Sequence, residues 1–90
     1  MDPIKQFGLA FNPQVEAAAE LSQTIRQYLA QQGAAPTAVH PIHERALRER
    51  IQEKAFQALI VLGGDGTILR ARHLCAAAGI PIVGVSRGTF

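Results

Sequence analysis

The amino-acid sequence predicts an α/β fold in which helices cover a mostly parallel sheet. Short apolar runs alternate along the chain with longer stretches that have helical periodicity. The run at residues 58–62 (ALIVL) shows no polar alternation, which is typical of a strand buried on both faces of a parallel sheet. The joints between runs are short, so we expect parallel strands connected through helices.

The first part of the chain predicts a strand followed by a long amphipathic helix. Residues 4–11 form the expected strand, and the turn-forming pair Asn12-Pro13 closes it. Asn12 is expected to cap the helix and Pro13 to occupy its first turn, with Gly33 at its end. The apolar positions expected to be buried, which recur at helical spacing, are Val15, Ala18, Leu21, Ile25, Tyr28 and Leu29.

The rest of the chain predicts three more strands and two more helices. The expected strands are residues 38–40, 58–62 and 80–85, and the expected helices are residues 44–56 and 68–78. Gly79 is the expected end of the last helix. The candidate buried positions of the preceding helix are Ala46, Leu47, Ile51 and Phe56. Together these elements predict a Rossmann-like three-layer sandwich, which we expect to be incomplete because no closing helix follows the last strand.

The composition disfavours several classes of protein. A net charge of +2 with scattered Lys and Arg residues favours a mixed, solvated surface over one that binds nucleic acid. No apolar run approaches the about 18 residues that span a bilayer, and the N-terminus lacks a signal-peptide core. The single cysteine, Cys75, suits a reducing compartment. We therefore expect a cytoplasmic protein that binds neither nucleic acid nor membranes.

The segment Gly63-Gly64-Asp65-Gly66-Thr67 predicts a ligand site. It joins a buried strand to a helix at the sheet edge where open α/β folds bind their ligands. Glycines leave the backbone N–H groups accessible to a phosphate or sugar, and the N-terminus of the following helix favours an anion there. An anion site is therefore expected from local chemistry alone.

Asp65 is unexpected in an anion site because a carboxylate repels phosphate. Three roles remain open: it accepts a hydrogen bond from a hydroxyl, acts as a general base, or holds a metal ion that bridges to phosphate. In a purely structural alternative, Asp65 or Thr67 caps the helix and the glycines form a tight turn. The segment is not a Walker A loop, since no lysine follows it, and Leu69 stands where the dinucleotide fingerprint requires a third glycine.

These residues resemble the motifs of the NAD kinases. That family carries G-G-D-G-T, a helix rich in Ala and Arg, and then I-P-x-x-G-x-N-x-G, which residues 63–67, 68–72 and 80–85 match without a gap. Arg87-Gly88 falls where the family has x-G, although Ser86 replaces the Asn of most of these kinases. The resemblance covers nearly the whole chain and is strongest from Ala58 onward.

The resemblance implies transfer of the γ-phosphoryl group of ATP to the 2′-hydroxyl of the adenosine ribose in NAD, giving NADP. It implies that Asp65 orients or deprotonates that hydroxyl and that Gly66 lines the same site through its backbone. Arg70 matches a basic position that contacts nucleotide in related kinases, with a solvated helix arginine as the alternative. A divalent ion, above all Mg²⁺, is expected to accompany ATP rather than occupy a dedicated protein site. Polyphosphate remains open as a donor.

The resemblance also implies a C-terminal β-rich domain that residues 1–90 do not contain. We therefore expect this chain to be a truncated N-terminal domain, inactive alone, of a protein that is homo-oligomeric when complete. Two alternatives remain. Diacylglycerol and sphingosine kinases share G-G-D-G-T, but residues 83–89 do not match the P-x-G-T-x-N segment that follows it in those enzymes. The other alternative is a non-catalytic nucleotide-binding module.

Four other residues are assigned no part in the chemistry. His40 and His43 have no carboxylate or cysteine at metal-ligand spacing and are expected to be surface or loop histidines. His73 follows Arg70 by one turn and is expected to be exposed without a function. Cys75 lies among alanines and is expected to be a small buried hydrophobe rather than a nucleophile.

Overall fold

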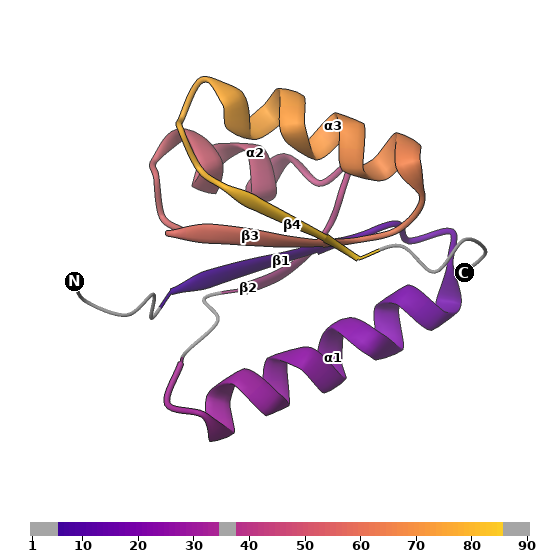
Figure 1. The fold of residues 1–90 in the computed structure, drawn as a ribbon. Helices are drawn as coiled ribbons and strands as arrows, with labels where there is room; N and C mark the ends of the chain where they lie inside the picture. The colour runs from indigo at the N-terminus through magenta and orange to yellow at the C-terminus, as the bar shows by residue number, and fades with distance from the viewer. Residues whose placement is uncertain (1–5, 35–37, 86–90) are drawn as a thin grey trace.

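The computed structural model describes residues 6–34 and 38–85, which form a four-stranded parallel sheet and three helices. In chain order the elements are β1 (Phe7–Phe11), α1 (Glu16–Gln31), β2 (Ala38–Pro41), α2 (Arg45–Gln52), β3 (Ala58–Leu62), α3 (Asp65–Ala76) and β4 (Ile82–Val85). Helix α1 covers one face of the sheet, and α2 and α3 cover the other (Figure 1). The predicted α/β three-layer sandwich is confirmed.

The strands are ordered β2-β1-β3-β4, so β1 and β3 form the middle of the sheet. Leu9 of β1 pairs with Val39 on one side and with Ile60 on the other, and all pairings are parallel. The chain passes from β1 to β2 through α1 and from β2 to β3 through α2, on the opposite face, so the connections change direction between β1 and β3. Open α/β sheets bind ligands outside the carboxyl ends of their strands at such a reversal.

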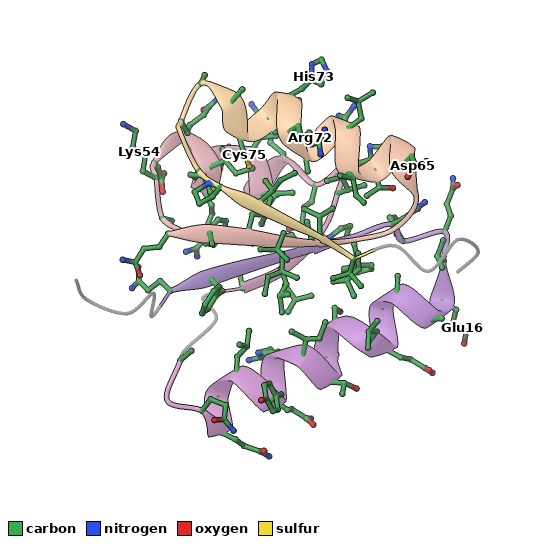
Figure 2. All side chains as sticks on the ribbon, viewed as in Figure 1. Glu16, Lys54, Asp65, Arg72, His73 and Cys75 are labelled. Carbon is green, nitrogen blue, oxygen red and sulfur yellow. The ribbon has the colours of Figure 1, made fainter. Side chains whose placement is uncertain are left out.

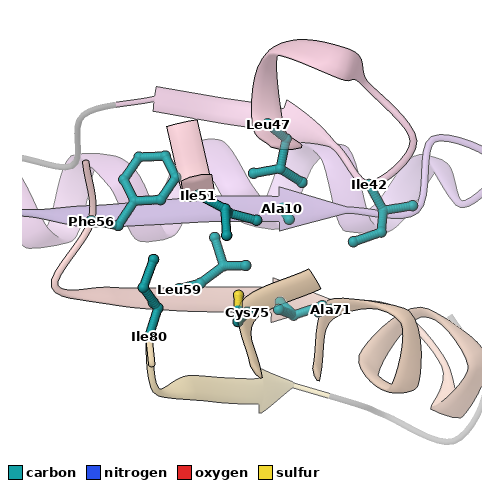
Figure 3. Packing of buried hydrophobic residues seen from close by; sticks show 10 residues of the cluster. Ala10, Ile42, Leu47, Ile51, Phe56, Leu59, Ala71, Cys75 and Ile80 are labelled. Atoms are coloured by element: carbon teal, nitrogen blue, oxygen red, sulfur yellow. The ribbon is translucent and has the colours of Figure 1, made fainter. Parts of the chain in front are cut away.

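Two apolar layers hold the helices against the sheet, and β3 contributes to both. Leu59 and Val61 belong to the layer under α2 and α3, and Ile60 and Leu62 belong to the layer over α1. Every residue of β3 is buried, which explains why its sequence shows no polar alternation. The α2 and α3 side, shown in Figure 3, contains Ala10, Ile42, Leu47, Ile51, Phe56, Leu59, Val61, Ala71, Cys75 and Ile80.

All three helices end with the same backbone arrangement. A residue with positive φ follows each helix: Gly33 (φ 88°), Lys54 (φ 56°) and Gly79 (φ 70°). Each donates its N–H to the carbonyl oxygen three residues back, and the next residue donates to the carbonyl oxygen five residues back. These bonds satisfy carbonyl groups that a helix end otherwise leaves free. The predicted helix ends at Gly33 and Gly79 are confirmed.

Several predicted helix boundaries are wrong. Helix α2 ends at Gln52 rather than at residue 56. Phe56 therefore lies in the loop after the helix, and its side chain is buried in the core from there. Helix α1 begins only at Glu16, and Asn12 does not cap it; the Asn12 side chain instead accepts a hydrogen bond of 2.9 Å from the N–H of Gln14. Strand β4 begins at residue 82 rather than at 80, and residues 4 and 5 of the first predicted strand lie outside the described residues.

The buried face of α1 differs from the prediction at two positions. Tyr28 is 60% exposed, whereas Ser22 is fully buried and donates a 2.7 Å hydrogen bond to the carbonyl oxygen of Ala19. Ser22 lies between Ala18 and Ile25 at helical spacing and therefore faces the sheet, while Tyr28 lies on the flank of that stripe. A serine with its hydroxyl satisfied inside its own helix can occupy such a position.

Candidate functional site

The loop of residues 63–67 lies at the carboxyl end of β3 and leads directly into α3. Two backbone hydrogen bonds fix the end of β3 between its neighbours. Asn12 donates its N–H to the carbonyl oxygen of Leu62 at 3.1 Å, and Gly63 donates its N–H to the carbonyl oxygen of Val85 at 3.2 Å. The loop therefore starts beside the reversal between β1 and β3, at the edge where the fold places a ligand.

Gly63 is required by the packing of the loop on α3. A Cβ atom at this buried position would lie 2.8 Å from both Cβ and Oγ1 of Thr67. No side chain fits without moving the first turn of the helix. Gly63 thus has a structural explanation that involves no ligand.

Gly64 and Gly66 have no such explanation. A Cβ atom at either position would meet nothing within 4 Å, and Gly64 has an ordinary extended conformation with φ −81°. Gly66 lies in the first turn of α3, where glycine is less favourable than alanine. The fold therefore tolerates side chains at both positions, and their absence leaves the backbone N–H groups of the turn open to a ligand.

Asp65 is the first residue of α3 and is exposed. Gly64 occupies the capping position, so the structural alternative in which Asp65 or Thr67 caps the helix is wrong. Within residues 6–34 and 38–85, no hydrogen bond or ion pair engages the Asp65 carboxylate. The carboxylate is available to accept a hydrogen bond from a ligand hydroxyl.

A shallow pocket of about 290 Å³ opens beside Asp65 along α3. Its other lining residues are Ile68, Leu69 and Arg72, so all of its described walls come from this helix. Ile68 is half-buried and packs close to Gly84 of β4. Leu69 is 55% exposed and is one of the few large apolar side chains that the described fold leaves in solvent.

The two arginines of α3 lie differently with respect to this pocket. Arg72 lines it, whereas Arg70 is exposed and is not among its lining residues. Figure 2 shows Asp65 at the start of α3 and Arg72 farther along the same helix. The structure thus groups Asp65 with Arg72, a residue that the sequence motifs do not single out, and leaves Arg70 outside this pocket.

Three of the remaining residues have the predicted exposure or burial. His43 and His73 are exposed, and His73 points away from the sheet (Figure 2). Cys75 is 2% exposed, and burial raises the pKa of its thiol, which suits a packing role rather than a nucleophile.

The prediction for His40 is wrong, because this residue is only 9% exposed. It lies in β2 and contacts Glu44, the residue that precedes α2. Its Nδ1 lies 3.1 Å from Oε1 of Glu44, and its Nε2 is buried without a hydrogen-bond partner among the described residues. The histidine therefore belongs to the packing of β2 against α2, and not to the loop of residues 63–67.

A second hollow of about 250 Å³ lies at the other end of α3, where it meets the end of α2. Its lining is largely apolar and includes Lys54 as its one charged residue: Ile51, Gln52, Lys54, Leu74, Ala77 and Ala78. Figure 2 shows Lys54 at the end of the molecule opposite Asp65. This hollow is therefore separate from the site at the carboxyl edge of the sheet.

The described residues contain no group of three or more His, Cys, Asp or Glu side chains that could hold a metal ion. Mg²⁺ in phosphate-transfer sites is often held by only one or two carboxylates together with the phosphates of the substrate. Asp65, an exposed carboxylate that no described residue binds, fits that requirement. The site thus suits a metal ion that arrives with a nucleotide.

Comparison with known proteins agrees with this geometry. Residues 31–90 match the model of the ATP-NAD kinase N-terminal domain. An NAD kinase of Chloroflexus aurantiacus is 28% identical over 90 residues, covering 94% of this chain and 30% of the relative. The bifunctional NADP phosphatase/NAD kinase of Methanocaldococcus jannaschii is 34% identical over 86 residues, covering 96% of this chain and 15% of the relative.

A shorter match of higher identity concerns an NAD kinase of Moorella thermoacetica, which is 56% identical over 34 residues, covering 38% of this chain and 11% of the relative. A parallel α/β sandwich with a glycine-rich strand-to-helix loop defines the class of open α/β domains, which bind ligands outside the carboxyl ends of their strands. The chain belongs to the ATP-NAD kinase N-terminal domain family. It spans no more than 30% of the length of these relatives.

Proposed function

We propose that the protein containing this chain is an NAD kinase, which transfers the γ-phosphoryl group of ATP to the 2′-hydroxyl of the adenosine ribose in NAD. One observation carries the proposal: the carboxylate of Asp65, which no described residue binds, lies in a turn whose glycines Gly64 and Gly66 are not required by packing. Membership of the NAD kinase family supports the same activity. No comparison favours a lipid kinase.

In the proposed reaction, Asp65 accepts a hydrogen bond from the attacking 2′-hydroxyl and takes up its proton as the new P–O bond forms. The oxygen of the hydroxyl attacks the γ-phosphorus of ATP, and ADP leaves with the electrons of the broken bond. Phosphoryl transfer depends mainly on positioning and on neutralising charge. The N–H groups in the first turn of α3 lack intrahelical partners and present a partial positive charge to the transferred group.

The other groups of the site take supporting roles in this proposal. Gly66 lines the site through its backbone, and Arg70 contacts nucleotide from outside the Asp65 pocket. Mg²⁺ arrives with ATP and neutralises phosphate charge, and polyphosphate is a further candidate donor. We place the complete protein in the cytoplasm as a homo-oligomer, with a C-terminal β-rich domain completing the site. None of the described helices is long and apolar enough to cross a membrane.

The activity can be tested in the full-length protein with ATP, Mg²⁺ and NAD by measuring NADP formation. Asp65→Asn removes the proton acceptor with little change of shape and should lower kcat by a factor of about 100 or more. Glu53→Gln is the control, because Glu53 is also an exposed acid and directly precedes Lys54, which lies at the end of the molecule opposite Asp65 (Figure 2). We expect Glu53→Gln to keep kcat within about twofold of the wild type, since exposed charges away from a site contribute little. Full activity of the Asp65→Asn protein would exclude the base role.

A further inference from the structure

Arg72 is the basic residue that the fold brings into the pocket of Asp65. With about 3.6 residues per turn, a residue seven places along a helix returns to within about 20° of the starting direction, whereas one five places along lies about 140° away. Arg72 is seven places from Asp65, and Arg70 is five. The geometry of the helix therefore puts Asp65 and Arg72 on one side of α3 and turns Arg70 away from it.

No described residue neutralises either end of this pocket. Arg72 is exposed, and no described residue forms an ion pair or hydrogen bond with it; the same holds for Asp65. By contrast, Arg45 on α2 pairs with Glu49 at 3.5 Å. The guanidinium group of Arg72 is left available for an anion from outside.

An apolar surface separates the two charges. Ile68 and Leu69 lie between Asp65 and Arg72 on the same side of α3, and Leu69 is 55% exposed. Side chains on a helix incline toward its N-terminus, so Arg72 extends over this surface in the direction of Asp65. The pocket thus offers a hydrogen-bond acceptor, an apolar floor and a cation in sequence. This order complements a nucleoside phosphate, which carries hydroxyls, an apolar ring or sugar face and an anion.

We propose that Arg72 binds a phosphate group of a nucleotide whose hydroxyl lies at Asp65. The proposal rests on the proposed function for the identity of that nucleotide, which is either ATP or NAD. Because Arg72 touches a phosphate and not the reacting hydroxyl, its loss weakens binding more than it slows the chemical step. A charge-assisted hydrogen bond to phosphate is strong enough for its removal to change affinity about tenfold.

The test uses isothermal titration calorimetry on the full-length protein with ATP and, separately, with NAD. Arg72→Ala should lower the affinity for one of the two nucleotides by about tenfold. Arg72→Lys should restore part of that affinity because it keeps a positive charge. Arg48→Ala is the control, since Arg48 is an exposed arginine on α2 outside this pocket. A loss confined to ATP assigns Arg72 to the donor phosphates, and a loss confined to NAD assigns it to the pyrophosphate. Steady-state kinetics should show a raised KM with kcat nearly unchanged.

The outcomes separate this inference from the proposed function. If the wild-type protein forms NADP but Arg72→Ala binds both nucleotides as the wild type does, the role of Arg72 is disproved and the kinase activity stands. If the wild-type protein binds nucleotide with an affinity that depends on Arg72 but forms no NADP, the role of Arg72 stands and the kinase activity fails. Absence of any nucleotide binding by the wild-type protein would disprove both.

Discussion

Among single residues, the loop glycines divide into one that packing requires and two that it does not. A Cβ atom at Gly63 would overlap Thr67, whereas Gly64 and Gly66 have room for one. Glycine in a helix is about 1 kcal/mol less favourable than alanine, so Gly66 weakens the first turn of α3. Access of a ligand to the backbone explains a glycine that the fold does not need.

Gly66→Ala should therefore raise stability and lower activity in the full-length protein. We expect the free energy of unfolding to rise by about 0.5–1 kcal/mol, measured as a higher urea midpoint. NADP formation should fall by a factor of about 10 or more, because a methyl group displaces the substrate. Gly79→Ala is the control: it has the same free space but φ 70°, so it should lower stability and leave the activity of the folded enzyme unchanged. A destabilised or fully active Gly66→Ala protein would contradict this account.

The sequence predicts part of this site and not the rest. Asp65 and Gly66 are recognisable because glycines between a buried strand and a helix mark a ligand-binding joint. The start of α3 is predicted three residues too late, since Gly64 and Gly66 have low helix propensity and hide the first turn. Arg72 is not singled out because α3 carries apolar residues on several sides, so periodicity does not tell which arginine faces the pocket.

At the scale of elements, the helix ends that carry glycine are predictable and the end of α2 is not. Gly33 and Gly79 stop α1 and α3 in left-handed conformations that glycine adopts at low cost. Lys54 adopts the same conformation after α2, but lysine is a good helix former and gives no stop signal. Phe56 continues the apolar periodicity beyond it, although its side chain packs from the loop, and the predicted helix is therefore too long.

Lys54→Gly should stabilise the protein for this reason. A left-handed conformation costs a residue with a Cβ atom about 1–2 kcal/mol, and glycine avoids this cost. Glycine also loses more backbone entropy on folding, which offsets part of the gain. We expect a net rise in the free energy of unfolding of about 0.5–1 kcal/mol, seen as a higher urea midpoint. The reverse change at the end of α1, Gly33→Lys, should lower the midpoint, and neither should alter NADP formation per folded molecule. A lower midpoint for Lys54→Gly would show that its side chain stabilises the turn.

For the whole molecule, the three layers are predictable because short apolar runs alternate with helical stretches along the chain. The strand order is not predictable, because short joints permit several orders of parallel strands. The observed order leaves β4 at an edge of the sheet, and Val83 in this strand is 53% exposed. Helix α1 packs mainly under β1 and β2 and does not cover Val83. Within the described residues, the fold is thus well packed around β1 and β3 and open beside β4, next to the half of α3 that carries Asp65.

This openness predicts that the 90-residue chain alone forms no NADP while the full-length protein does. Pockets for ligands of nucleotide size bury about 70–90% of the ligand surface, but the described walls of the Asp65 pocket all come from α3. The chain spans at most 30% of relatives such as the Chloroflexus aurantiacus enzyme, so we expect a longer protein to supply further walls. The measurement compares both proteins at equal molar concentration in a cycling assay for NADP, with circular dichroism to confirm that the short chain keeps its helices. NADP formation by the folded short chain would show that one face of α3 suffices for catalysis.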